Sequence, residues 1–111
     1  MDRIVEVYQK EYDEFVKSME KIEEDYQQNK NIKSSKEYLQ KLACKYKKHY
    51  GVCLTFLQYG TKAFDCGEIE YGYNILQIGI NTFENAPKDT GICLRFVQYY
   101  MEYGKSSLGN Y

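Results

Sequence analysis

Hydrophobic residues recur every three or four positions between residues 2 and 28, a spacing that predicts one long amphipathic helix. The apolar stripe consists of Ile4, Tyr8, Tyr12, Phe15, Met19, Ile22 and Tyr26. Asp2 is placed to cap the start of this helix, and pairs such as Glu6 and Lys10 lie four residues apart on its polar side. We therefore expect a first helix over residues 2–28 with one apolar and one polar face.

The stretch "QQNKNIKSSKE" is polar and interrupts this pattern. Ser34 followed by Glu37 has the form of a capping box, in which two side chains satisfy free backbone N–H groups at a helix start. The apolar edge that follows consists of Leu39, Leu42 and Tyr46. These features predict a second helix that begins at Ser34 and runs to about His49.

The pattern of apolar residues in the second half of the chain fits both a β-strand and an α-helix. The stretch "EIEYGYNI" alternates as a strand would, yet apolar residues between Ile69 and Phe83 also recur at helical spacings of four and three. A duplication favours the helical template, because "GVCLTFLQYG" at 51–60 returns as "GICLRFVQYY" at 91–100. A period of about forty residues is typical of paired antiparallel helices. The stretches "FDCGEIE" and "ENAPKDTG" supply the turns between such helices.

We therefore predict an all-α fold of about five helices, in which antiparallel helical hairpins stack as a short array. The two duplicated segments are then the first helices of successive hairpins and present equivalent faces. These faces are formed by Val52, Phe56, Tyr59 and Ala63 in one copy and by Ile92, Phe96, Tyr99 and Tyr103 in the other. The alternative is an α+β fold, in which two helices precede a β-meander over residues 51–104.

Small and large residues alternate in a characteristic way through this region. The small residues are Gly60, Gly72 and Gly79. Leu76 lies between the last two glycines, and Phe56 precedes the first. Together with "ILQIGINTFENAPKDTGICLRFVQYYMEYGK", this pattern makes residues 51–105 resemble the tetratricopeptide and half-a-TPR (HAT) repeat family.

This resemblance implies that neighbouring helices cross closely at the three glycines. The length of 111 residues predicts a single domain over residues 1–111. Within it, the resemblance implies residues 1–50 as a two-helix cap and residues 51–111 as the repeat region. HAT-type proteins are scaffolds in RNA processing, and a similar helical domain opens the spindle-checkpoint kinases. The resemblance therefore implies binding rather than catalysis. Two departures from the family are Phe56 and Phe96, which stand where it usually has tryptophan.

The residues that could carry chemistry are few. Cys44, Cys53, Cys66 and Cys93 have no paired zinc-ligand spacing, and His49 is the sole histidine. His49 and Cys53 are four residues apart, but Gly51 is expected to break the helix between them and leave His49 exposed at a helix end. No glycine-rich phosphate-binding motif is present. We expect no catalytic residue, metal or cofactor.

Charge is distributed in blocks although the net charge is only −1. Residues 1–29 carry a net charge of −5 and residues 30–50 a net charge of +6. The predicted basic surface consists of Lys41, Lys45 and Lys48 on one helical face, with Tyr46 interleaved. Three interpretations remain: an acidic first helix packed antiparallel on a basic second helix, an acidic protein partner, or nucleic acid. The sequence pI of about 5.9 argues against a dedicated nucleic-acid binder.

A second candidate surface is the tyrosine-rich tail "QYYMEYGKSSLGNY". Tyr99, Tyr100 and Tyr103 cannot all face one small core, so we expect them to line the groove of the helical array, to contact another chain or to form a homodimer through the C-terminal helix. No signal-like start or membrane-length apolar run is visible, which leads us to expect an intracellular, soluble protein without membrane partners.

Taken together, these observations predict a non-enzymatic protein–protein interaction module or scaffold. The alternative is a small viral- or phage-like inhibitor of α+β fold that masks a nucleic-acid-binding enzyme.

Overall fold

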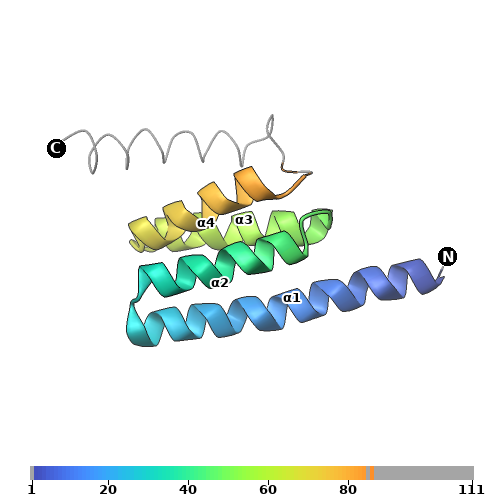
Figure 1. Cartoon of the computed structure of the whole chain (residues 1–111), viewed down its shortest axis with the longest axis horizontal. Coiled ribbons are helices and arrows are strands. Elements are labelled where there is room, and N and C mark those ends of the chain that lie inside the picture. Colours follow the sequence, from blue (N-terminus) through green and yellow to red (C-terminus); the bar gives the residue numbers. More distant parts are fainter. Residues whose placement is uncertain (1, 85, 87–111) are drawn as a thin grey trace.

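A computed structural model describes residues 2–84 and 86, and this part of the chain consists of four α-helices without a strand (Figure 1). The helices are α1 (Asp2–Asn29), α2 (Ile32–Lys45), α3 (Tyr50–Asp65) and α4 (Ile69–Thr82). Each runs antiparallel to the one before it, so the described part is two stacked helical hairpins (Figure 1). The predicted all-α fold is confirmed. The β-meander alternative is wrong, because α3 and α4 occupy its first half.

The first duplicated segment, 51–60, lies within α3 and is helical, as the repeat predicts. Its expected inner face is largely buried: Val52, Phe56 and Ala63 are in the core, and Tyr59 is half-buried against it. The second duplicated segment, 91–100, lies outside the described residues. The equivalence of the two segments therefore stays a prediction.

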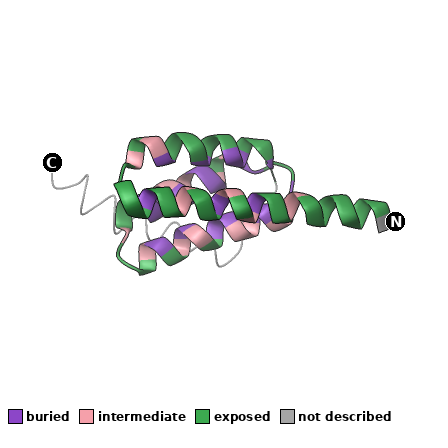
Figure 2. Ribbon diagram, turned by 90° about the horizontal axis from the view of Figure 1, so that it is seen from below, coloured by how far each residue is buried: buried purple, intermediate pink, exposed green. Residues whose placement is uncertain are grey.

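All four helices contribute to one hydrophobic core (Figure 2). The helix α4 packs on both α3 and α2, whereas α1 packs mainly on α2 and more lightly on α3. The largest fully buried side chains are Tyr71, Phe15, Phe56, Met19, Leu39, Leu57, Ile75 and Leu76. Aromatic rings from α1, from α3 and from the residue that follows α4 meet at the centre, where Phe56 lies 6.4 Å from Phe15 and 5.5 Å from Phe83 between ring centroids.

The ends of the second helix differ from those predicted. Asn31 rather than Ser34 caps α2, since its Oδ1 atom accepts a hydrogen bond of 3.0 Å from the Ser34 backbone N–H. The helix begins two residues early because Asn31 is an equally good capping residue and directly follows Lys30, whose left-handed backbone (φ 51°) ends α1. The helix also ends at Lys45 instead of near His49, because His49 is used to start α3.

In the hairpin formed by α3 and α4, glycines occupy both the turn and the point where the two helices cross. Gly67 makes the turn with a φ of +92°, which glycine adopts without steric cost. At the crossing, a Cβ atom on Gly72 would lie 2.5 Å from the Phe64 backbone nitrogen and 2.7 Å from the Gly60 carbonyl oxygen. A Cβ atom on Gly79 would instead meet the Leu57 side chain. The predicted close approach is confirmed where Gly72 meets the Gly60 backbone, whereas an added Cβ atom at Gly79 meets side chains only.

Two stacked tyrosines tie α1 to α4. The rings of Tyr26 and Tyr71 are nearly parallel, with centroids 3.8 Å apart. The Tyr26 hydroxyl donates to Glu68, which also forms an ion pair of 2.7 Å with Lys30. Burial and the nearby Glu68 carboxylate raise the pKa of Tyr26 to about 12. Burial also raises the pKa of Tyr71 above its ordinary value.

These tyrosines make stability sensitive to alkaline pH. Since the pKa of Tyr26 rises from 10.0 to about 12 on folding, the unfolded chain holds fewer protons than the folded chain between these values. The stabilising effect is complete below pH 10.0 and is lost as the pH rises through about 12. Denaturant unfolding followed by circular dichroism should show that the stability advantage of the wild type over Tyr26→Phe shrinks across this range. A constant difference would contradict the assignment.

Candidate functional site

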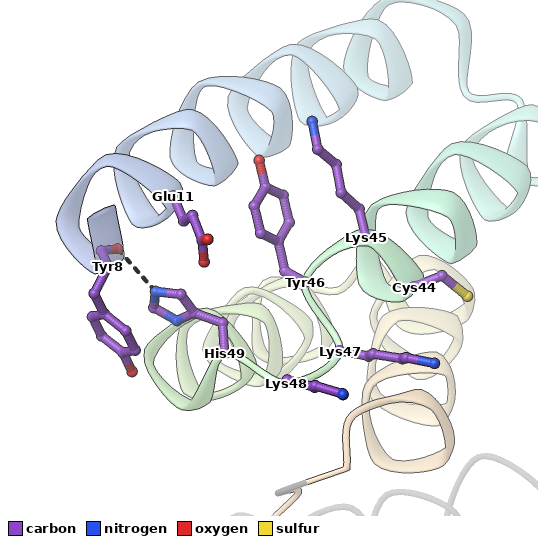
Figure 3. A pocket seen from close by; sticks show the side chains of 8 residues that line it. All are labelled: Tyr8, Glu11, Cys44, Lys45, Tyr46, Lys47, Lys48 and His49. Carbon is purple, nitrogen blue, oxygen red and sulfur yellow. Dashed lines mark hydrogen bonds between the residues drawn. The ribbon is translucent and has the colours of Figure 1, made fainter. Parts of the chain in front are cut away.

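The turn between α2 and α3 meets α1 at one end of the bundle and forms a pocket of about 300 Å³ there (Figure 3). Its lining residues come from two places in the sequence that are more than thirty residues apart. They are Tyr8, Glu11, Cys44, Lys45, Tyr46, Lys47, Lys48 and His49. We call this the turn pocket.

His49 holds the two walls of the turn pocket together. The side chain is only 4% exposed, and its ring stacks on Tyr8 with centroids 3.6 Å apart. Its Nδ1 atom accepts a hydrogen bond from the Val52 backbone N–H, which caps α3. The proton must then reside on Nε2, which donates to the Tyr8 carbonyl oxygen at 3.0 Å. Gly51 completes the joint by donating its backbone N–H to the Tyr8 hydroxyl.

This geometry corrects the expectation for His49 and Gly51. His49 is buried at a helix start rather than exposed at a helix end, and Gly51 lies inside the first turn of α3 without breaking it. The neighbouring Cys53 is fully buried, and burial raises the pKa of its thiol to about 11. Both groups are therefore placed for packing and capping. Within residues 2–84 and 86, no three His, Cys, Asp or Glu side chains gather as metal ligands would.

The structure separates the predicted basic surface into different environments. Lys41 and Lys45 are exposed on α2, whereas Lys48 is exposed in the turn beyond the end of that helix. Tyr46 is not available to stack on a base, as it is 5% exposed and packs edge-on against Phe15 at 6.0 Å. The prediction that Lys48 shares a helical face with Lys41 and Lys45 is wrong, because α2 ends at Lys45. The prediction that Tyr46 lies exposed between these lysines is also wrong, because its ring is buried in the core.

The helices α1 and α2 pack antiparallel, which is the arrangement that the first of the three charge interpretations describes (Figure 1). Among the described residues, however, Lys36, Lys41, Lys45 and Lys47 form no ion pair with α1. The side chains of Lys41, Lys45 and Lys47 are exposed.

The N-terminal turns of α1 extend beyond the turn pocket and lie apart from the other described helices (Figures 1 and 2). Ile4, Val5, Val7 and Tyr8 are 73%, 66%, 50% and 45% exposed. A second hollow of about 380 Å³ lies here. It is lined by Arg3, Ile4, Val7, Tyr8 and Glu11. Because the two hollows share Tyr8 and Glu11, we call them together the overhang groove.

The sequence pattern identified Ile4 and Tyr8 as apolar-face residues but did not show that they would be exposed. The available signal was helix length, since α1 has 28 residues and α2 only 14. A partner of half the length cannot cover the whole stripe, because both helices rise about 1.5 Å per residue. Only the C-terminal part of the stripe, including Phe15, Met19 and Tyr26, is buried.

Tyr99, Tyr100 and Tyr103, the other predicted binding residues, lie outside the described residues. None of the described helices is long and apolar enough to span a bilayer. Comparison with protein-family models, with curated proteins and with solved structures finds no match to this chain.

Proposed function

We propose that the protein is a non-enzymatic protein–protein interaction module that binds a helical partner in the overhang groove. The observation that carries this proposal is the run of exposed apolar side chains on α1, from Ile4 to Tyr8, which leads directly into the lysine-lined turn pocket. Apolar patches bordered by charge are characteristic of binding surfaces. Anchors spaced three and four residues apart suit helix-to-helix packing.

Two further features support binding over catalysis. His49 uses both ring nitrogens in structural hydrogen bonds, and Cys53 is a buried thiol whose raised pKa disfavours the reactive thiolate. The glycine-marked crossing of α3 and α4 supports the proposed likeness to TPR and HAT hairpins. We propose no inhibitor function, because that alternative depended on a β-meander where α3 and α4 lie.

The charge around the groove favours a protein partner with acidic residues. Lys45, Lys47 and Lys48 line one end of the groove, where carboxylates of a bound helix would gain favourable electrostatic steering. A nucleic-acid partner is less well supported, because Tyr46 is buried and cannot supply the base-stacking contact.

The proposal can be tested by site-specific photo-crosslinking in cells that naturally express the protein. A benzophenone amino acid at Val7 is expected to yield a discrete crosslinked protein, since this side chain is half exposed within the groove. The same probe at Gln28, which is exposed near the other end of α1, is the matched control. Absence of a product at Val7, or the same product at both positions, would rule the site out.

A further inference from the structure

We propose that the helix bound in the overhang groove is the N-terminal part of α1 from a second copy of this chain. The two segments would lie antiparallel about a two-fold axis, each covering the apolar stripe of the other. This inference rests on the proposed function, because it names the partner of the same surface.

The shape of the stripe is suited to a helix of its own kind. Ile4 and Tyr8 lie one turn apart on its centre, and Val7 and Val5 flank them on either side. At about 100° per residue these four side chains cover an arc of about 160°, which is as wide as the buried face of a globular helix. In the described part of the chain, all four of these side chains remain at least 45% exposed. The stripe therefore offers a complete helix-packing face.

The charges that border the stripe are self-complementary. Arg3 and Glu11 line opposite ends of the same hollow, eight residues apart. In an antiparallel pair centred on Val7, Arg3 of each copy lies opposite Glu11 of the other. A parallel pair would instead place like charges side by side. The two-fold arrangement uses one surface twice and closes on itself, so it yields a dimer and not a filament.

The bundle end adds a long-range attraction. An incoming copy advances its first turns toward the turn pocket, where Lys45, Lys47 and Lys48 lie. Residues 2–11 of that copy carry three acids and two bases, a net charge of −1, and residues 30–50 of the receiving copy carry +6. A weak attraction therefore acts in both directions of the symmetric pair.

The size of the contact predicts a weak and reversible dimer. The contact segment from Arg3 to Glu11 is about 14 Å long. Two such segments bury less than the roughly 1,200 Å² of a stable interface. We therefore expect a dissociation constant on the order of 100 µM.

Sedimentation velocity of the full chain from about 5 to about 500 µM tests this range. The weight-average mass is expected to rise from 13.2 kDa toward twice that value. Val7→Glu should remain a monomer throughout, because it places a carboxylate on the two-fold axis. Gln28→Glu adds the same charge to an exposed position on the same helix and should dimerise as the wild type does.

A charge exchange identifies the antiparallel pairing. Arg3→Glu and Glu11→Arg are each expected to weaken association at least about fivefold, and the double variant should recover most of it, since each pairing is again between opposite charges. A wild type that stays at 13.2 kDa at the highest concentration overturns the second copy as the partner. A dimer that persists in Val7→Glu also overturns it. If either result is obtained and Val7 crosslinks to a different protein, the proposed function still stands. If Val7 crosslinks to no protein, the proposed function and the dimer are both ruled out.

Discussion

Replacing Gly72 with alanine is expected to lower the free energy of unfolding by about 3 kcal/mol. The added methyl group would lie 2.5 Å from the Phe64 nitrogen and 2.7 Å from the Gly60 carbonyl oxygen. Both atoms belong to the backbone of α3, so α3 and α4 must separate to admit it. The gain of about 1 kcal/mol from the better helix propensity of alanine is too small to compensate. Urea unfolding followed by circular dichroism at 222 nm measures the loss.

Gly79→Ala is the matched control, because it makes the same chemical change seven residues later on the same helix. Its methyl group would meet side-chain atoms, Leu57 Cδ2 at 2.5 Å and Phe56 Cδ1 at 3.1 Å, which can shift more readily than the backbone atoms that Gly72→Ala would meet. The propensity gain then offsets much of the packing cost, and we expect less than half the loss seen for Gly72→Ala. Equal losses for the two variants would show that the crossing is not as close as the structure indicates.

The second large effect is expected at His49. His49→Ala removes the cap of α3, the hydrogen bond to the Tyr8 carbonyl and the stacked ring, and should cost about 2–3 kcal/mol in total. Chemical denaturation provides the measurement. Limited proteolysis should also show faster cleavage in the first turns of α1, since Tyr8 loses its main contact there.

His49→Asn separates capping from the contacts to Tyr8. Asparagine is among the best N-cap residues, so it should recover about 1 kcal/mol relative to alanine while still leaving α1 without its stacking partner. Rapid proteolysis at the α1 N-terminus should therefore persist in this variant. If asparagine is no better than alanine, the Nδ1 bond to the Val52 N–H does not contribute to stability as proposed.

The features that depend on periodicity, on the internal duplication or on the repeat resemblance could be predicted from sequence. The stripe of α1 follows from spacing along the helix, the helical nature of 51–60 follows from the forty-residue duplication, and the close crossing at Gly72 is implied by the family resemblance. The helix ends could not be predicted in the same way. Asn31 and Ser34 are both good caps, and only the path of the chain decides between them.

The candidate site was harder to predict, because burial there depends on tertiary packing. Histidine is not a usual capping residue, so nothing in "KYKKHYG" marks His49 as the start of α3. Tyr46 is amphipathic and suits either a binding surface or a core, and its contact with Phe15 decides the outcome. The exposure of Ile4 follows only when the lengths of α1 and α2 are compared in space.

The stacking of Tyr8 on His49 also bears on the entropy of association. An isolated helix end frays, because its first turns have few partners to hold them. Here the Tyr8 ring and carbonyl are attached to α3, so that fewer than two free turns project beyond the attachment. Any ligand of this surface thus meets a segment whose backbone is already largely ordered, and most of the conformational freedom that binding would otherwise remove has been lost during folding.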